Sequence, residues 1–412
     1  MTTDQQTQRP QAAQLDAADP LATQREAFYT PDAGQLTSYL DGNSLGRPLK
    51  ATAANLQNFV HNAWGSRLIR GWDEQWMDEP TRVGDRIGEV TLGAAAGQVT
   101  VGDSTSVMLY KLIRAAVDAQ PGRDEIIIDR DNFPTDRFII EGIAAERGAT
   151  IKWIAPNPAS GVRAADLDGI LGERTAVVVL SHVAYRSGFL ADAPGITNAV
   201  HRAGALMLWD LCHSVGSVPM ELDAWGVDLA VGCTYKYLNG GPGSPAFAYV
   251  NAARQNRLQQ PIWGWMGADN PFGMTEAYRP AEGIRRFITG TPPVLAMQPI
   301  KDMVELIASV GMDAVREKSI NLTEYAIRLA DELLVPMGAA IVSPRNAAER
   351  GSHITVDHPR FRDVTAKLWE RGVIPDFRPP HGLRIGLSPL STSYAEVELG
   401  VTAIRDALAE LQ

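Results

Sequence analysis

The side chains best suited to chemistry lie near the middle of the chain, in the segment TYKYLNGGPGSP at residues 234–245. Lys236 stands there between two tyrosines, after an apolar run and before a glycine-rich run. Burying a charged lysine without a partner is costly, so its place among apolar neighbours needs a reason. Asp210 ends an earlier apolar run, ALMLWD, and His213 follows three residues later.

A lysine and an aspartate in such positions suit pyridoxal phosphate. The lysine can carry this cofactor covalently, and the aspartate can keep its pyridine nitrogen protonated, so that the ring accepts electrons. Taken alone, Asp210 is better explained as the cap of a helix, and Lys236 alone is weak evidence. Together, after successive predicted strands, the two residues favour this cofactor.

The phosphate group of such a cofactor needs hydrogen-bond donors. Ser104, Thr105 and Ser106 open a predicted helix in GDSTSVMLYKLIRAA (102–116), where backbone N–H groups and the helix dipole attract an anion. Ordinary helix capping explains the same hydroxyl groups equally simply. Phe133, in RDNFPTDRF, offers a ring for the face of the pyridine, although a loop phenylalanine also commonly covers the core.

These residues must be positioned by the elements around them. Short β-branched runs predict buried strands, and amphipathic stretches at 136–148 and 193–204 predict helices between them. This alternation predicts an α/β fold with a mostly parallel sheet covered on both faces, which binds ligands at the carboxyl ends of its strands. The predicted strands are 124–130, 150–156, 175–183, 205–211 and 228–235.

The pattern changes at about residue 296, where longer helices begin. A smaller α+β unit follows, with strands predicted at 339–344, 353–358 and 382–388. The first thirty residues are polar, which is typical of a loosely held arm. We therefore divide the chain into a flexible arm (1–30), a segment serving the active site and the small domain (31–50), a large cofactor-binding domain (51–295) and a small C-terminal domain (296–412).

Composition excludes several other classes of protein. The 412-residue chain has a net charge of −10, which predicts no general attraction to nucleic acid or anionic membranes. It lacks G-x-G-x-x-G, G-x-x-x-x-G-K-[ST], H-E-x-x-H and C-x-x-C motifs, which argues against nicotinamide, P-loop and zinc chemistry. Two cysteines, no visible signal peptide and no long apolar run indicate a cytoplasmic protein without a metal site.

Several blocks of the sequence resemble the kynureninase family of bacterial type, from about residue 25 to the C-terminus. The most specific blocks are GNSLG and YKYLNGGPG. The others are GDSTSVMLYK, NFPTDRF, HVAYRSG, LWDLCHSVGSVP, GWMG and GTPPVLAM. The resemblance implies a fold-type-I pyridoxal-phosphate enzyme related to the class V aminotransferases, with a seven-stranded sheet in the large domain.

The resemblance also implies a role for each site residue. Lys236 would carry the cofactor, Asp210 would pair with its pyridine nitrogen, and Phe133 would stack on its ring. Tyr235 would hydrogen-bond the phosphate and relay a proton. Arg384 would bind the substrate α-carboxylate, as its planar fork suits. Arg378 is the alternative holder of the carboxylate if Arg384 only supports packing. Asn43 and Ser44 would lie over the substrate. The remaining cofactor-binding residues would be Thr105, Ser106, Asp136, Ser181, His213, Trp265 and Thr291.

The implied reaction is the hydrolytic cleavage of L-kynurenine to anthranilate and L-alanine. Trp265 and Thr291 match positions that the neighbouring subunit supplies in the family, so a homodimer with shared sites is implied. Threonine at 291 favours unsubstituted kynurenine over its 3-hydroxy form. The alternatives are a relative acting on a modified kynurenine, a class V aminotransferase, a cysteine desulfurase, and a binding module without activity.

Overall fold

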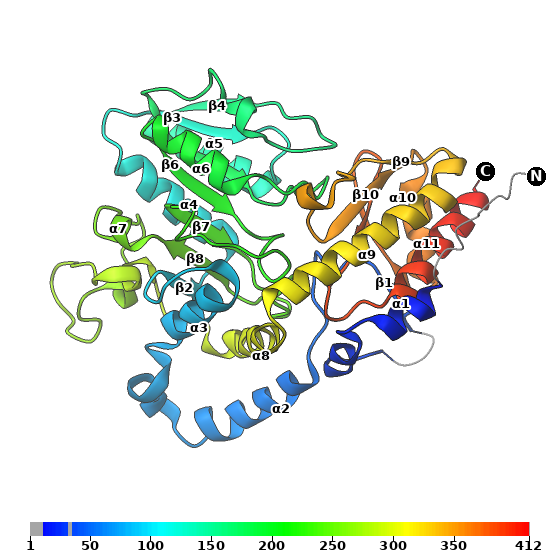
Figure 1. The fold of residues 1–412 in the computed structure, drawn as a ribbon. Helices are drawn as coiled ribbons and strands as arrows, with labels where there is room; N and C mark the ends of the chain where they lie inside the picture. Colours follow the sequence, from blue (N-terminus) through cyan, green and yellow to red (C-terminus); the bar gives the residue numbers. More distant parts are fainter. Residues whose placement is uncertain (1–10, 32–34, 412) are drawn as a thin grey trace, which may run out of the picture.

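The structure is a computed structural model that describes residues 11–31 and 35–411. Two lobes lie side by side, and the long helix α9 (Met312–Leu333) runs along both of them (Figure 1). The larger lobe holds a seven-stranded sheet and the smaller lobe a four-stranded sheet. This division matches the α/β fold with a second α+β domain that the sequence predicts.

The large sheet has the strand order β2-β8-β7-β6-β5-β3-β4. All five predicted strands are present in it, and β8 alone runs against its neighbours. The mostly parallel sheet is therefore confirmed, and β2 and β8 are the strands that the sequence analysis missed. The bounds are β2 (Val99–Gly102), β3 (Glu125–Asp129), β4 (Thr150–Ile154), β5 (Thr175–Ser181), β6 (Leu206–Asp210), β7 (Leu229–Gly232) and β8 (Ala246–Val250).

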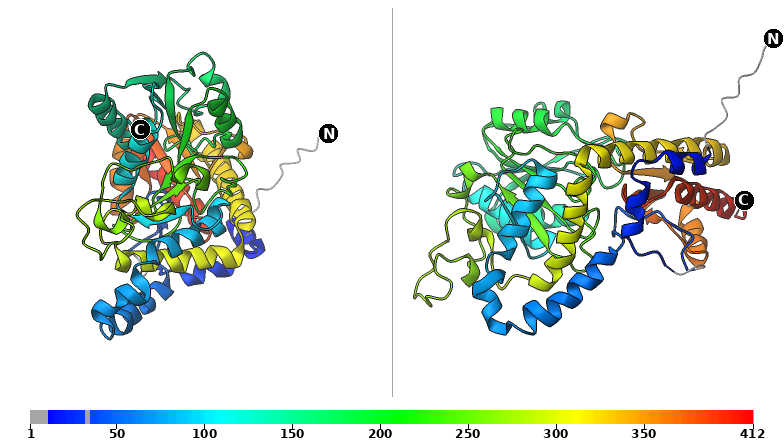
Figure 2. Two further views of the ribbon diagram at one scale, coloured as in Figure 1. Left: turned by 90° about the vertical axis from the view of Figure 1, so that its left-hand side faces the viewer. Right: turned by 60° about the horizontal axis from the view of Figure 1, so that its bottom comes forward.

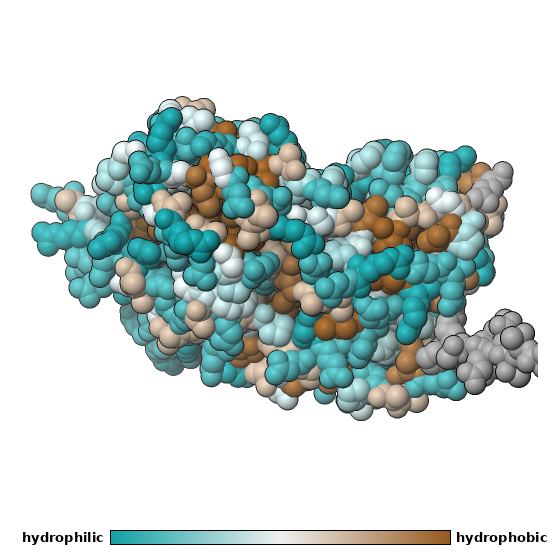
Figure 3. All heavy atoms as spheres, turned by 45° about the horizontal axis from the view of Figure 1, so that its top comes forward, coloured by the Kyte–Doolittle hydropathy of each residue, from teal (hydrophilic) through white to brown (hydrophobic). Residues whose placement is uncertain are grey.

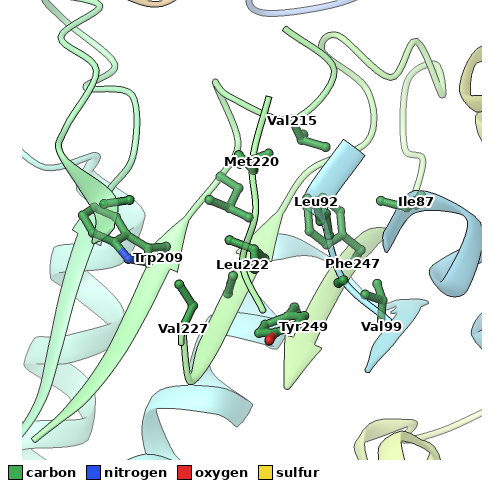
Figure 4. Packing of buried hydrophobic residues seen from close by; sticks show 14 of the residues in the cluster. Ile87, Leu92, Val99, Trp209, Val215, Met220, Leu222, Val227, Phe247 and Tyr249 are labelled. Carbon is green, nitrogen blue, oxygen red and sulfur yellow. The ribbon is translucent and has the colours of Figure 1, made fainter. Parts of the chain in front are cut away.

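Helices cover both faces of this sheet, because successive residues of its central strands point to opposite sides. Ile126 and Ile128 pack with α4 (Thr105–Asp118) and α5 (Pro134–Arg147), whereas Ile127 packs with α6 (Ala193–Arg202) on the other face. Figure 4 shows part of the second cluster, in which Trp209, Phe247 and Tyr249 fill the space beside β6 and β8. The core therefore fixes the strand ends that carry the candidate site.

The boundary between the domains lies inside α9 and not at residue 296. Helix α8 (Val294–Val310) packs on α2 (Lys50–Asn58) and α3 (Glu79–Ile87), and Met297 and Ile300 belong to the core of the large domain. The core of the small domain begins along α9, at Leu322. The predicted boundary differs because the amphipathic pattern of α8 does not reveal which sheet its apolar face covers.

The small domain contains an antiparallel sheet in the order β12-β13-β10-β9. The three strands predicted here are confirmed as β9 (Ala340–Ile341), β10 (His353–Asp357) and β13 (Gly382–Gly386). Strand β1 (Ser38–Tyr39), from the N-terminal part of the chain, pairs with β11 (Val373–Ile374). The remaining elements of the domain are β12 (Asp376–Arg378), α10 (Phe361–Glu370) and α11 (Tyr394–Ala409).

The described part of the N-terminal arm is docked on the small domain. Helix α1 (Ala12–Ala18) lies against α11, and the Asp16 carboxylate accepts hydrogen bonds from the backbone N–H groups of Tyr394 and Ala395, both at 3.0 Å. The prediction of a loosely held arm is therefore wrong for residues 11–30. The Asp16 carboxylate stabilises the contact, because a negative charge is favourable at the N-terminal end of a helix. Residues 1–10 lie outside the described part of the chain.

Short helical turns complete the large domain and the connections. They include η1 (Ala22–Ala27), η2 (Phe59–Trp64), η3 (Leu68–Arg70), η4 (Trp72–Trp76), η5 (Gly88–Leu92), η6 (Ala164–Leu167), α7 (Ala252–Gln255), η7 (Trp265–Gly267), η8 (Gly283–Phe287), η9 (Val335–Met337) and η10 (Ala347–Glu349). Figure 2 shows the α2–η4 region standing away from the sheet. Within residues 11–31 and 35–411, no helix is long and apolar enough to cross a bilayer. The face drawn in Figure 3 is mostly hydrophilic, with small scattered hydrophobic patches.

Candidate active site between the two domains

A cavity of about 190 Å³ lies at the carboxyl ends of the central strands, where the small domain meets the large one. The large domain contributes residues that follow β2, β3, β6 and β7, and the small domain contributes two arginines from β12 and β13. The lining residues are Ser44, Thr105, Ser106, Phe133, Thr135, Asp136, Asp210, Cys212, His213, Tyr235, Lys236, Arg378 and Arg384. The structure thus brings together most of the residues that the sequence analysis selected.

The turn that carries Lys236 packs tightly against residues 41–46. The backbone N–H of Gly46 donates to the carbonyl oxygen of Tyr235 at 2.8 Å, and a Cβ atom at Gly46 would lie 2.4 Å from the Lys236 carbonyl oxygen. Gly241 and Gly243 have φ angles of 85° and 79°, a region that glycine adopts at little cost. The glycine-rich sequence therefore lets the chain turn sharply directly after the lysine.

His213 shares the floor of the cavity with Lys236. The lysine Nζ lies 3.4 Å from Nδ1 and 3.3 Å from Nε2 of this ring. Burial lowers the pKa of His213 well below its ordinary value, and the positive charges of Lys236 and Arg384 lower it further. The ring is therefore neutral and provides a flat, uncharged surface beside the lysine.

Two carboxyl groups face the same cavity. Oδ1 of Asp210 accepts a hydrogen bond from the backbone N–H of Cys212 at 2.8 Å and so closes a turn, and Oδ2 is left for a second role. Helix capping does not explain Asp210, because the described residues 211–228 contain no helix before β7. Asp136 is buried, and among the described residues its Oδ2 has no hydrogen-bond partner. Burial raises the pKa of Asp136 well above its ordinary value, as does the negative charge of Asp210. A buried polar atom without a partner is expected where a ligand binds.

The N-terminal end of α4 supplies donors at another side of the cavity. Ser104 caps the helix, with its Oγ accepting from the backbone N–H of Val107 at 3.4 Å, so capping explains this hydroxyl group. Thr105 and Ser106 line the cavity itself. Below this turn, the buried Nζ of Lys111 donates to Asp103 Oδ2 at 2.9 Å and to Thr289 Oγ1 at 2.6 Å. These hydrogen bonds hold Asp103, which directly precedes the capping Ser104.

Phe133 lies at the start of α5 and forms an edge-to-face contact with Tyr185, with ring centroids 5.4 Å apart. Its ring borders the cavity, as a stacking role requires. Ser181 ends β5 without lining the cavity, and its Oγ donates to Oδ1 of Asn132 at 3.1 Å. Ser181 and Asn132 are therefore both outside the set of residues that line the cavity.

The small domain closes the cavity with a group of charged side chains. Nε of Arg384 donates to Asp376 Oδ2 at 2.6 Å, and its Nη2 donates to Ser44 Oγ at 3.0 Å. Nε of Arg378 donates to the same carboxylate oxygen at 2.7 Å. Asp376 was not among the predicted site residues, and Arg378 was considered only as an alternative to Arg384. Their signal is the antiparallel register of β12 and β13, which pairs Asp376 with Arg384.

Three further predicted residues lie away from the cavity. Asn43 is completely buried, and a Cβ atom on Gly386 would lie 1.8 Å from its Oδ1, so this amide packs behind the cavity wall. The side chain of Trp265 is 43% exposed on η7. Thr291 is exposed beside a separate hollow that includes Gly102 and Asp103. Within one chain, neither Trp265 nor Thr291 is among the residues that line the cavity.

Comparisons with known proteins agree with this architecture. An apo cysteine desulfurase from Thermococcus onnurineus NA1 superposes with a TM-score of 0.79 at 16% identity, over 90% of this chain and 95% of that one. A C-DES variant with glycine covalently linked to its PLP cofactor gives a TM-score of 0.80 at 17% identity, over 92% and 100%. The fold is therefore that of the fold-type-I enzymes, as the sequence predicts.

The sequence comparisons are more specific. The kynureninase of Burkholderia pseudomallei (strain K96243) is 42% identical over 407 residues, which cover 97% of this chain and 95% of that protein. The kynureninase of Pseudomonas fluorescens is 39% identical over 398 residues, covering 95% and 93%. A family model described as the kynureninase C-terminal domain matches residues 315–404. The chain belongs to the kynureninase family.

Proposed function

We propose that this protein is a pyridoxal-phosphate enzyme that hydrolyses the Cβ–Cγ bond of L-kynurenine to give anthranilate and L-alanine. Family membership at about two-fifths identity over nearly the whole chain supports this reaction. The observation that carries the proposal is the cavity that brings Lys236 and Asp210, from the ends of β7 and β6, together with Arg384 from β13 of the small domain.

The residues around the cavity fit this cofactor. Lys236 would hold it covalently, Oδ2 of Asp210 would meet its pyridine nitrogen, and Phe133 would lie against its ring. The α4 N-terminal end, with Thr105 and Ser106, suits the phosphate because unpaired N–H groups and the helix dipole favour an anion there. Asp136 Oδ2, which is buried without a partner among the described residues, fits a ligand with a hydrogen-bond donor or bound water.

The remaining cofactor contacts would come from His213, Tyr235 and Ser181, of which His213 and Tyr235 line the cavity. When bound, pyridoxal phosphate supplies an electron sink for bonds at the substrate α-carbon. Every other part of the chemistry is assigned to side chains of the protein and to water.

The protein residues then bind the substrate and move protons. Lys236 Nζ would remove the proton from the substrate Cα, and Tyr235, next to it in sequence, would relay a proton at the leaving carbon. Arg384, with Ser44 on its Nη2, would orient the α-carboxylate. Water would add to the side-chain ketone before the Cβ–Cγ bond breaks, which makes the overall reaction a hydrolysis.

We also propose a homodimer in which each cavity is completed by Trp265 and Thr291 of the other subunit. Both residues are exposed in the single chain and lie away from its own cavity, although the family resemblance places them at the cofactor. Trp263, Phe272 and Met274 are also exposed in the same region, as an interface would explain. Threonine at 291 favours unsubstituted L-kynurenine as the substrate.

A cysteine desulfurase is the main competing function, because a solved cysteine desulfurase superposes well. That chemistry needs a reactive, accessible cysteine. Cys212 lines the cavity, but a hydrogen bond with Cys233 and burial raise the pKa of its thiol well above the ordinary value, so it is not a reactive thiolate. Cys233 is buried and does not line the cavity, so neither cysteine meets this requirement. Two free thiols also support a reducing, cytoplasmic location.

The test is a substrate screen with the holoenzyme. L-Kynurenine should yield anthranilate, followed by its fluorescence, together with equimolar L-alanine. A class V aminotransferase would instead form an α-keto acid, and a desulfurase would release sulfide from L-cysteine. Efficient turnover of a ring-modified kynurenine, with none of L-kynurenine, would move the substrate assignment to the modified compound.

A further inference from the structure

Most hydrogen-bonding capacity of Arg384 is already used inside the protein. Its Nε donates to Asp376 Oδ2 at 2.6 Å, its Nη1 donates to the carbonyl oxygen of Tyr185 at 2.8 Å, and its Nη2 donates to Ser44 Oγ at 3.0 Å. Nη2 also lies 2.5 Å from Asp376 Oδ2. Each nitrogen of this guanidinium group therefore has an acceptor, and the side chain is only 1% exposed.

This arrangement limits what Arg384 offers to a substrate. A carboxylate binds an arginine most strongly through two parallel N–H···O bonds from one edge of the guanidinium group. The edge formed by Nε and Nη2 is occupied by Asp376, and Nη1 and Nη2 each have one further protein acceptor. A full two-bond contact with a substrate carboxylate would therefore require Arg384 to give up a protein partner.

Arg378 differs in this respect. Its Nε donates to Asp376 Oδ2 at 2.7 Å, which fixes the inner end of the guanidinium group. Among the described residues, its terminal nitrogens Nη1 and Nη2 have no hydrogen-bond partner, and the side chain is 32% exposed and lines the cavity. Arg378 therefore presents free N–H groups where Arg384 does not.

The charges of the group leave room for an anion. One carboxylate, Asp376, is shared by two guanidinium groups, so the three side chains together retain a positive charge. The other nearby carboxyl group, Asp41, is partly buried, and this burial raises its pKa to about 6. Just below neutral pH, Asp41 is therefore partly protonated and neutralises less of the charge of the arginines.

We propose that Arg378 is a further substrate-binding residue, which holds the α-carboxylate of the amino-acid substrate together with Arg384, and that Asp376 is the positioning residue that fixes both arginines. The inference rests on the proposed function in one respect: the ligand must be an amino acid that binds beside Lys236. It divides the anionic contact between two arginines of one hairpin, β12 and β13.

The experiment measures binding and not turnover. The holoenzyme is titrated with L-alanine, the proposed amino-acid product, and with ethylamine, which is alanine without its carboxylate, and the cofactor absorbance reports binding. The variants are Arg378→Gln, Arg378→Lys and Arg384→Gln. Arg174→Gln is the matched control, because Arg174 also pairs with an aspartate, Asp124, but on the exposed surface away from the cavity.

We expect Arg378→Gln to raise the dissociation constant of L-alanine about ten- to a hundredfold, as loss of a charge-assisted contact predicts, and to leave ethylamine binding unchanged. Arg378→Lys should recover part of the loss, because a lysine retains the charge without the fork. Arg384→Gln should weaken L-alanine in the same selective way.

Two results would overturn the inference. Wild-type affinity for L-alanine in Arg378→Gln would show that Arg384 binds the carboxylate alone. Equal weakening of L-alanine and ethylamine would show that Arg378 only supports the packing of β12. If wild type binds L-alanine but forms no anthranilate from L-kynurenine, the proposed function fails while this inference is still decided by the titration.

Discussion

The side-chain nitrogen of Lys236 lies almost equally far from the two ring nitrogens of His213, at 3.3 and 3.4 Å. The lysine follows β7 and the histidine follows β6, so the register of two neighbouring parallel strands sets this separation. Since burial keeps the pKa of His213 well below its ordinary value, the ring adds no second positive charge beside the amine. The pair therefore suits a reactive lysine at the carboxyl ends of these inner strands.

The first prediction concerns Lys236. Borohydride reduction of the holoenzyme should label Lys236 alone, as peptide mass spectrometry can check, and Lys236→Ala should lose both the label and the visible absorbance of lysine-bound cofactor. Lys367→Ala, on an exposed ion pair with Glu410, is the control and should keep both. A label on any other lysine would remove the assignment.

The second prediction separates the two oxygens of Asp210. Asp210→Asn keeps an oxygen that can accept from the Cys212 N–H, but it removes the charge that would hold the pyridine nitrogen protonated. Turnover should fall at least about tenfold, as loss of a charge-assisted hydrogen bond predicts, whereas the urea midpoint should change little. Near-normal turnover would contradict the assigned role. A large loss of stability would show that the charge mainly supports the turn.

The third prediction tests the shared site. Lys236→Ala and Trp265→Ala should each be inactive or nearly so. Mixed dimers made by unfolding and refolding the two variants together should regain activity, because one of their two cavities combines an intact Lys236 with an intact Trp265. Mixing that restores nothing would place Trp265 in the same subunit as the lysine it serves, or outside the site.

The fourth prediction concerns the buried ammonium group of Lys111. Lys111→Met should lower the free energy of unfolding by about 1–3 kcal/mol, because Thr289 and the Phe287 carbonyl lose a buried donor. It should also weaken cofactor binding, measured by equilibrium dialysis, since Asp103 directly precedes the capping Ser104. Lys367→Met, at an exposed pair, should change stability by less than about 1 kcal/mol.

The fifth prediction uses Asp129, at the end of β3. Burial raises its pKa from 3.8 to about 6, so the folded state binds this proton more tightly than the unfolded state does. Its contribution to stability is therefore lost as pH rises from about 4 through 6. Asp129→Asn removes this titration. As pH rises across this window, the unfolding free energy of the variant should therefore increase relative to that of the wild type, by at most about 3 kcal/mol. Urea unfolding of the apoprotein between pH 4.5 and 7.5 checks this, and parallel curves would contradict it.

The sequence predicted those parts of the fold that local patterns encode. Runs such as EIIID and TAVVVLS are buried on both faces, so their continuous apolar character identified β3 and β5. Strand β2 has four residues, and β8 directly follows the glycine-rich turn, so neither showed a pattern long enough to be recognised. The orientation of β8 depends on pairing that no local pattern contains.

The site residues also divide into those that local sequence patterns mark and those that depend on strand pairing. Lys236, Asp210, Thr105 and Phe133 stand at strand or helix ends that the sequence marks, and the structure brings them to one cavity. The link between Arg378, Asp376 and Arg384 depends on the register of an antiparallel hairpin, which becomes visible only when β12 pairs with β13. Asn43 and Ser44 are neighbours in sequence, yet only Ser44 reaches the cavity, because adjacent side chains in this loop point in different directions.

The two ends of the chain build the same domain: α1 packs on α11, β1 pairs with β11, and Leu40 lies in one core with Val401 (Figures 1 and 2). During translation, the early segment leaves the ribosome long before its partners exist. The large domain has all its strands by residue 250 and can fold first. The apolar residues of the first segment therefore lack their partners on α11 until that helix is released. Premature termination just before α11 would remove Val397, Val401 and Ile404 from this core and leave α1 without the helix on which it packs.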